Sequence, residues 1–188
     1  MVNISVKQIV RPVGSFKGTG LLVIDVQERL APAIPTAPQV VPQISALIEK
    51  ARQVALPILA TEQYSRGLGP TIPELRGLLA SGEVLEKIHF AATREPAFRD
   101  ALGDRQLKHC VVVGMEAHVC VQESVLGLLA DGVAVSVVGD AVASRNDLNR
   151  RCALARMARA GASIVTSAEV LAGLEELSNG SGEALSPS

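Results

Sequence analysis

Residues 109–139, "HCVVVGMEAHVCVQESVLGLLADGVAVSVVG", hold two apolar runs with a helical pattern between them. The runs, 109–114 and 133–139, are continuously apolar rather than alternating in polarity, which is typical of strands buried on both faces of a parallel sheet. The segment between them repeats apolar side chains at helical spacing, at Val121, Val125, Leu128 and Leu129. The stretch therefore predicts a strand, a helix and a second strand of a parallel sheet.

Similar apolar runs lie at 20–26, 56–60, 83–88 and 162–166, so strands and helical patterns alternate along the chain. The 188 residues suffice for one domain with a substantial core, whereas two domains would both be thin. This alternation, with right-handed crossovers, predicts a three-layer α/β/α Rossmann-like fold with a six-stranded, mainly parallel sheet. We expect residues 18–175 to form this domain.

Both ends of the chain differ from the predicted domain. Residues 1–17 alternate Val2, Ile4 and Val6 with other side chains, which fits either an edge strand or an arm that reaches a neighbouring subunit. The last residues, "SNGSGEALSPS", are polar and rich in Gly and Ser, so we expect 176–188 to form a disordered tail.

The charge balance and the cysteines exclude several classes of partner. A formal net charge of −1 offers no field for nucleic acid or an anionic membrane, and no apolar stretch is long enough to span a bilayer. Three cysteines without ligand spacing argue against a disulfide framework and a zinc site, and no Gly-rich nucleotide fingerprint occurs. We therefore expect a cytoplasmic protein without metal or organic cofactor.

Three reactive side chains stand at predicted strand ends: Asp25 in "LLVIDV", Lys87 in "EVLEKI", and Cys120 just after "HCVVVG" and its turn. The carboxyl ends of parallel strands meet at one edge of a sheet, so these groups are predicted to converge. Taken singly, each has a structural alternative: a turn-shaping carboxylate, a surface lysine and a small buried thiol. Together they indicate a cysteine nucleophile with a base and a charge partner.

Cys120 lies at a strand–turn–helix elbow. The dipole and the unpaired amides of a helix N-terminus favour a thiolate, so we expect a nucleophilic sulfur near neutral pH. The same amides can receive the oxyanion of a tetrahedral intermediate.

The blocks "LLVIDVQ", "EKIHF" and "VVVGMEAHVCVQESVLGLLADGVAVSVVGDAVASR" resemble the isochorismatase-like cysteine hydrolase family, and residues 61–75, "TEQYSRGLGPTIPEL", resemble a metal-independent, uncharacterised branch. The resemblance implies a triad in which the Asp25 carboxylate takes the proton of Cys120 and Lys87 stabilises the charges. It also implies a homo-oligomer and a cis peptide between Met115 and Glu116, which directs the backbone amides of Glu116 and Cys120 at the oxyanion.

Two departures from the family pattern restrict the reaction that the resemblance implies. Nicotinamidases of the family carry an Asp-x-His metal motif where this chain has "TEQYSRG", and true isochorismatases lack the nucleophilic cysteine. The resemblance therefore favours hydrolysis of an amide, carbamoyl or related acyl bond of a small molecule, without metal.

Further residues near strand ends are candidates for the substrate pocket: Gln27, Glu62, Gln63, Tyr64, Phe90, Met115 and His118. Gln27 fits a turn equally well, Tyr64 fits packing or a subunit interface, and His118 fits a solvated turn. The Glu116 carboxylate is either a pocket group or a structural ion-pair partner.

We predict a cysteine hydrolase of a small-molecule C–N or related acyl bond, acting through a covalent acyl-enzyme. Two alternatives on the same fold are a catalytically silent oligomeric binding protein and a redox sensor whose thiol is Cys120.

Overall fold

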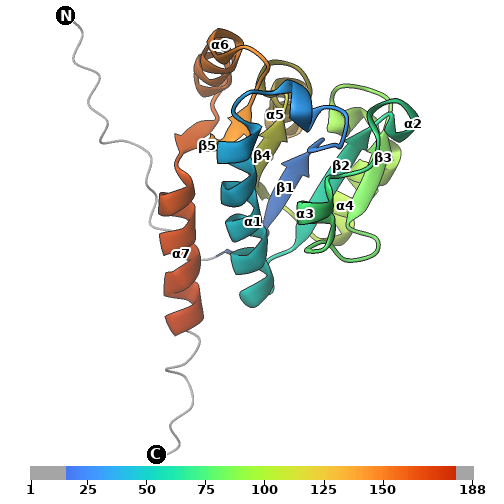
Figure 1. Cartoon of the computed structure of the whole chain (residues 1–188). Helices are drawn as coiled ribbons and strands as arrows, with labels where there is room; N and C mark the ends of the chain where they lie inside the picture. The colour runs from blue at the N-terminus through green and yellow to red at the C-terminus, as the bar shows by residue number, and fades with distance from the viewer. Residues whose placement is uncertain (1–15, 181–188) are drawn as a thin grey trace, which may run out of the picture.

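The structure is a computed structural model that describes residues 16–180, within which six strands form one parallel sheet of order β3-β2-β1-β4-β5-β6. The strands are β1 (Thr19–Ile24), β2 (Ile58–Gln63), β3 (Val84–Lys87), β4 (His109–Met115), β5 (Ala134–Ala143) and β6 (Ser163–Val165). Their carboxyl ends point toward the top of Figure 1. The predicted fold class is confirmed.

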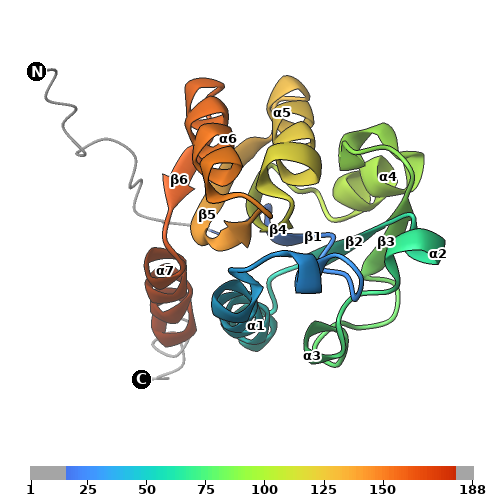
Figure 2. The same ribbon diagram turned by 45° about the horizontal axis from the view of Figure 1, so that its top comes forward.

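Helices cover both faces of the sheet, and Figure 2 shows the three layers. One face carries α1 (Ala37–Gln53), α3 (Pro73–Arg76) and α7 (Ser167–Gly180), and the other carries α4 (Pro96–Asp104), α5 (Gln122–Ala130) and α6 (Asp147–Arg159). Shorter helical segments are η1 (Ala31–Ala33), α2 (Ser65–Leu68), η2 (Ala92–Arg94) and the π-helical turn η3 (Ala117–Val121).

Side chains that alternate along the strands fill two apolar clusters, one on each face of the sheet. In β1, Leu21 and Val23 belong to the cluster under α1 and α7, whereas Leu22 and Ile24 belong to the cluster under α4, α5 and α6. All six residues of β1 are buried. A central strand covered on both faces explains why its sequence is continuously apolar.

The ends of the described chain differ from the prediction in one respect. Helix α7 continues to Gly180, so residues 176–180 are helical rather than part of a disordered tail. Leu174 and Leu177 pack against the cluster under α1 and α7, which anchors this last part of the helix. Most of the predicted N-terminal arm, residues 1–15, and residues 181–188 lie outside the described part of the chain.

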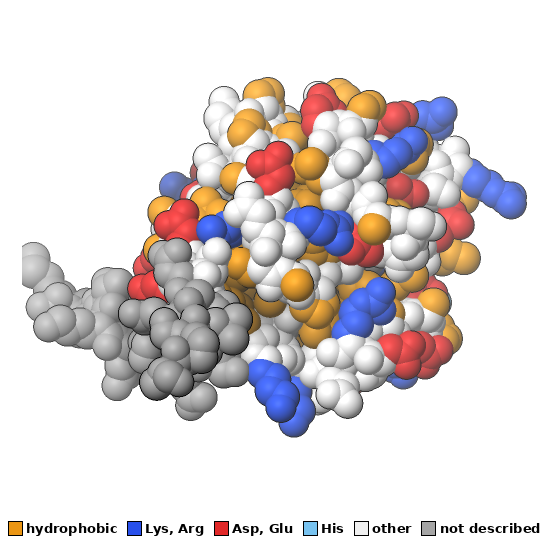
Figure 3. Space-filling view, turned by 90° about the horizontal axis from the view of Figure 1, so that it is seen from below, with side chains coloured by type: hydrophobic (Ala, Val, Ile, Leu, Met, Phe, Trp, Pro, Cys, Tyr) orange, Lys and Arg blue, Asp and Glu red, His pale blue; other side chains and the backbone are white. Residues whose placement is uncertain are grey.

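The face at the amino ends of the strands mixes acidic and basic side chains around scattered apolar atoms (Figure 3). No charge of one sign dominates the described atoms on this face. Within residues 16–180, none of the helices has the length and the apolar character that a membrane crossing requires.

Candidate active site

The reactive side chains come from three strands that end at the same edge of the sheet. Asp25 follows β1, Lys87 is the last residue of β3, and Cys120 lies in the π-helical turn η3 that follows β4. Strand β2 lies between β1 and β3, so Gln63 at the end of β2 stands between Asp25 and Lys87 in the order of the sheet. Asp25 has a φ of 50°, a left-handed conformation in which β1 ends and the chain turns away.

Asp25 and Lys87 form a buried ion pair. The Lys87 ammonium Nζ lies 2.8 Å from Asp25 Oδ2, and the two side chains are 1% and 0% exposed. The hydroxyl of Thr61 donates a hydrogen bond of 2.7 Å to Asp25 Oδ1. Asp25 Oδ2 is buried and, apart from the ion pair, has no hydrogen-bond donor among the described residues, so it keeps acceptor capacity inside the site.

Three more oxygen atoms surround the Lys87 ammonium. Nζ donates to Gln63 Oε1 at 2.7 Å and lies 3.2 Å from both the His89 and the Phe90 backbone carbonyl oxygens. A buried ammonium requires such partners, because removing it from water is expensive. The loop after β3 therefore holds Lys87 against Asp25.

Cys120 is buried, and its sulfur lies 4.0 Å from Gln63 Oε1. The pKa of the Cys120 thiol is raised to about 12, chiefly by burial and then by the charge of Asp25, whereas Lys87 acts to lower it. Burial likewise raises the pKa of Asp25, against the opposing effect of Lys87. The resting site thus holds a neutral thiol beside an ion pair, not the preformed thiolate expected from the helix N-terminus.

The elbow before Cys120 has a rigid framework. The Met115–Glu116 peptide bond is cis, and the Glu116 carbonyl oxygen accepts hydrogen bonds from the amides of Val119 and Val121. The Glu116 carboxylate is bound by Arg145, whose Nε and Nη2 each donate at 2.9 Å and whose backbone amide donates at 3.1 Å. Of the two readings of Glu116, the geometry supports the structural ion pair.

Two predicted pocket residues hold loops instead of facing the thiol. Gln27 is buried; its amide group donates to the carbonyls of Gln63 and Gly69, and its Oε1 accepts from the Gln63 amide. Glu62 Oε1 accepts from the backbone amide and the hydroxyl of Thr71. Gln27 thus ties the segment that follows β2 to the end of β1, and Glu62 ties the same segment to β2 itself.

The remaining predicted residues differ in where they lie. Tyr64 and Phe90 are 56% and 57% exposed beside the loops that hold Lys87. The His118 ring lies 3.0 Å from the Ser144 hydroxyl and 3.4 Å from the Asn149 amide, on the side of α6. Met115 is fully buried in the cluster under α1 and α7, because side chains alternate along β4, so its predicted place in a pocket wall is wrong.

Two residues that support the site, Thr61 and Glu95, were not predicted from the sequence. Thr61, which binds Asp25, comes directly after the run 56–60; β2 continues through polar residues to Gln63, so a longer strand would have placed Thr61 at the site. Glu95 binds the loop after β3 from the start of α4, and nothing in its sequence context "TREPAF" indicates that contact.

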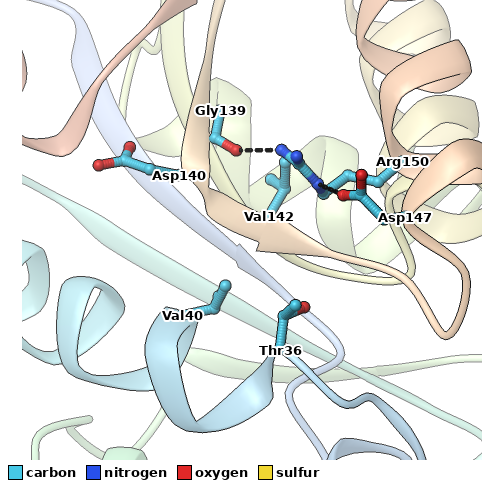
Figure 4. Close-up of a pocket in the computed structure, with 7 residues that line it drawn as sticks. All are labelled: Thr36, Val40, Gly139, Asp140, Val142, Asp147 and Arg150. Carbon is cyan, nitrogen blue, oxygen red and sulfur yellow. Dashed lines mark hydrogen bonds and ion pairs between the residues drawn. The ribbon is translucent and has the colours of Figure 1, made fainter.

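A separate hollow of about 380 Å³ lies where the first turn of α1, the end of β5 and the start of α6 meet (Figure 4). The charged groups of its lining already have partners: Arg150 donates to the Gly139 carbonyl at 2.9 Å and to Asp147 at 2.8 Å, while Asp140 accepts from Ser167, which lies outside the lining. Among residues 16–180, no three His, Cys, Asp or Glu side chains gather in a way that could hold a metal ion.

The chain matches the family model "Isochorismatase domain" over residues 19–169. It is 39% identical over 153 residues to isochorismatase domain-containing protein 2A of Mus musculus, covering 80% of this chain and 72% of that protein. The structure is similar to that of the MAR1 ribonuclease of Caenorhabditis elegans, with a TM-score of 0.80 and 35% identity over 87% of this chain and 88% of that one.

The structure is also similar to YcaC from two bacteria. The Escherichia coli protein, described as an octameric hydrolase of unknown specificity, has a TM-score of 0.77 and 26% identity, with 86% of each chain covered. The Pseudomonas aeruginosa protein, with hexane-2,5-diol and covalent acrylamide, has a TM-score of 0.80 and 26% identity over 93% of this chain and 86% of that one. By the extent of the domain match and the identity to these relatives, this chain belongs to the isochorismatase domain family.

Proposed function

We propose that the protein hydrolyses a C–N bond of a small amide or carbamoyl compound, or a related acyl bond, through a covalent intermediate on Cys120. The observation that carries this proposal is the buried Asp25 Oδ2, which has acceptor capacity left close to the Cys120 thiol. Both members of the ion pair interact with that thiol: Asp25 raises its pKa and Lys87 lowers it. A carboxylate that can take the thiol proton and a fixed cation beside it are what a cysteine nucleophile needs.

In the first half of the reaction, the sulfur bonds to the carbonyl carbon while its proton moves to Asp25, and the carbonyl π electrons move to oxygen. The tetrahedral intermediate then breaks its C–N bond, and the amine leaves with the proton from Asp25. Since the resting thiol is neutral, proton transfer accompanies attack on a bound substrate. Lys87 stabilises the negative charge that is shared between the carboxylate and the sulfur.

In the second half, water attacks the thioester and gives a proton to Asp25. The C–S bond breaks, the acid leaves, and the proton returns to the sulfur. We assign the oxyanion in both halves to the backbone amides of Glu116 and Cys120, which the Arg145–Glu116 ion pair helps to hold in place. This assignment requires no metal ion.

Burial of Cys120 supports a small substrate, because only small groups reach a thiol that is 6% exposed. The covalent acrylamide in P. aeruginosa YcaC supports a reactive site that small molecules can enter, since acrylamide is a small electrophile whose alkene carbon adds to thiols. We also propose that the chain forms a homo-oligomer, as the name of E. coli YcaC describes for that protein.

Acrylamide alkylation of the full chain tests the nucleophile. Cys152 is exposed and would react first, so the reference protein carries Cys152→Ser. We expect one adduct, located at Cys120 by peptide mass spectrometry, with buried Cys110 unmodified. Lys87→Met should slow the reaction at least about tenfold, the effect of one pKa unit at the thiol, because Lys87 lowers the pKa of Cys120. Asp25→Asn should also slow it, although the charge of Asp25 raises that pKa, because the variant removes the base that takes the thiol proton.

Each single variant leaves a buried charge without its partner, so the double variant Asp25→Asn/Lys87→Met serves as the folding control. It removes both charges with side chains of similar size and should keep the circular dichroism spectrum of the parent. A Cys120 that stays unmodified in the parent, or that reacts equally fast in the folded double variant, would reject the proposed triad.

The two alternative functions predict other outcomes. A redox sensor would form a sulfenic acid at Cys120 with dilute peroxide and no acyl adduct, and a silent binding protein would form neither. A panel of small amides, hydroxamates and carbamoyl compounds should yield an acyl adduct on Cys120 in intact-mass spectra. The panel includes RNA, because the C. elegans neighbour is named a ribonuclease; RNA cleavage that survives Cys120→Ala would contradict the proposal.

A further inference from the structure

Glu95 gathers three hydrogen bonds on one oxygen atom. It lies between η2 and α4, and its Oε1 accepts from the backbone amides of Ile88 and His89 at 2.9 and 3.0 Å and lies 2.9 Å from His89 Nδ1. Donation from these backbone amides is the main reason that the pKa of Glu95 falls to about 2. The carboxylate therefore ties the start of the loop after β3 to the start of α4.

The same loop makes most of the contacts of the Lys87 ammonium. Its carbonyl oxygens at His89 and Phe90 each lie 3.2 Å from Nζ. Its carbonyl at Ile88 accepts a hydrogen bond of 2.7 Å from Gln63 Nε2, and the Oε1 of that amide group accepts from Nζ at 2.7 Å. Three of the four oxygens around Nζ thus depend, directly or through Gln63, on the conformation of residues 88–90.

We propose that Glu95 is a positioning residue for the catalytic lysine, acting through the backbone of residues 88–90 rather than by contact with the reacting atoms. This inference rests on the proposed function, since it concerns the same thiol and ion pair. Glu95 fixes the Ile88 and His89 amides, and so fixes the direction of the carbonyls that hold Nζ beside Asp25 and Cys120. In this way the Glu95 carboxylate, at the protein surface, fixes the position of the buried Lys87 ammonium.

The chemical consequence of losing this anchor follows from the charges at the site. An ammonium group has three N–H donors, and Asp25, Gln63 and the two loop carbonyls compete for them. If the loop carbonyls turn away, the cation shifts and stabilises the Cys120 thiolate less. Since Lys87 lowers the pKa of the thiol, its displacement should raise that pKa and slow attack by sulfur.

The test measures the acrylamide rate at Cys120 between pH 7 and pH 10 in the full chain carrying Cys152→Ser. We expect Glu95→Ala to lower the rate about tenfold at each pH, the equivalent of one pKa unit at the thiol. Glu95→Gln keeps an acceptor oxygen for the two amides and should restore the rate to within about threefold of the parent, because the net contribution of one neutral hydrogen bond is modest.

Glu169→Ala is the matched control. Glu169 Oε2 accepts from the backbone amide and hydroxyl of Thr166, so it is also a carboxylate that anchors a loop before a helix, but it does so at the start of α7. Its loss should lower the unfolding midpoint in urea to a similar extent as Glu95→Ala while leaving the alkylation rate unchanged. A purely structural role of Glu95 would make the two variants behave alike.

The outcomes separate this inference from the proposed function. If Lys87→Met slows alkylation of Cys120 and Glu95→Ala does not, the positioning role is wrong and the triad stands. If Glu95→Ala and Glu95→Gln slow it equally, the role does not depend on the amides of residues 88 and 89, which also rejects the inference. If Lys87→Met has no effect, the proposed function itself fails.

Discussion

At the scale of single residues, the most unusual choice is a lysine among the largest fully buried side chains of the protein. Removing Lys87 and Asp25 from water has a desolvation cost that their attraction does not reliably recover, and apolar replacements of a buried pair are often as stable. Stability therefore does not explain the pair. Its place beside Cys120, with an acceptor oxygen still available, fits retention for chemistry.

Glu95 should make the stability of the protein depend on pH in a defined window. The pKa of its carboxyl is about 2 in the folded protein against an ordinary 4.5, so its stabilisation is fully present above pH 4.5 and is lost as the pH falls toward 2. We expect the urea midpoint of the parent to exceed that of Glu95→Gln near neutral pH, with the gap closing below pH 4.5. A gap that stays constant with pH would contradict this origin.

Single residues also show the limits of what the sequence could predict at the site. Asp25, Lys87 and Cys120 were identified because reactive side chains at the ends of parallel strands share one edge of the sheet. The support from Glu95 could not be seen, because it is made to backbone amides, and any residue type at positions 88 and 89 except proline would offer those. A contact between a side chain and the backbone is hard to predict from sequence, because the residue that supplies the backbone group can be of almost any type.

At the scale of elements, Gly114 controls how β4 meets β1. It pairs with Ile24 and has a φ of 124°, and a Cβ atom there would lie 2.7 Å from the Ile24 nitrogen and closer still to its carbonyl oxygen. We expect Gly114→Ala to lower the free energy of unfolding by about 3 kcal/mol or more, since the steric clash with the Ile24 backbone adds to the strain of a positive φ. Urea denaturation measures this loss.

Gly132, in the turn between α5 and β5, separates backbone strain from crowding. Its φ is 78°, but a Cβ atom would meet nothing within 4 Å. Gly132→Ala should therefore cost only about 1–2 kcal/mol, the penalty of a left-handed alanine. Equal losses in the two variants would show that the approach of β4 to β1 is not the decisive factor at Gly114.

The six strands were predicted from continuous apolar runs, and their ends show where that signal stops. Strand β2 extends through Thr61, Glu62 and Gln63, because pairing with β1 and β3 continues after apolar side chains are no longer required. The π-helical turn that carries Cys120 was expected as the first turn of an α-helix. Apolar spacing cannot distinguish these over a single turn.

At the scale of the whole molecule, assembly is the main prediction. The chain has a mass of 19.6 kDa, and light scattering after size-exclusion chromatography of the full chain should give a multiple of that mass. The large apolar side chains at the edge that carries the site, Tyr64, Ile88 and Phe90, are all more than half exposed, which is compatible with cover by another subunit. A monomer at micromolar concentration would refute the expectation.

The architecture could be read from the alternation of elements, because helices on both faces make every central strand apolar throughout. The order of the strands could not be predicted in this way, since an apolar run does not indicate which other strands pair with it. In the folded chain β3 lies at one edge of the sheet, with β2 between it and β1.

That order has an evolutionary consequence. Because β2 lies between the strands that bear the carboxylate and the lysine, whichever residue ends β2 stands over the middle of the reaction centre, as Gln63 does here. A substitution at this position would change the surroundings of the Cys120 sulfur and would also remove an acceptor of the Lys87 ammonium. If the proposed triad acts, a descendant of this fold that varies residue 63 must therefore keep an acceptor for the lysine there, which limits the side chains through which new substrates can be reached.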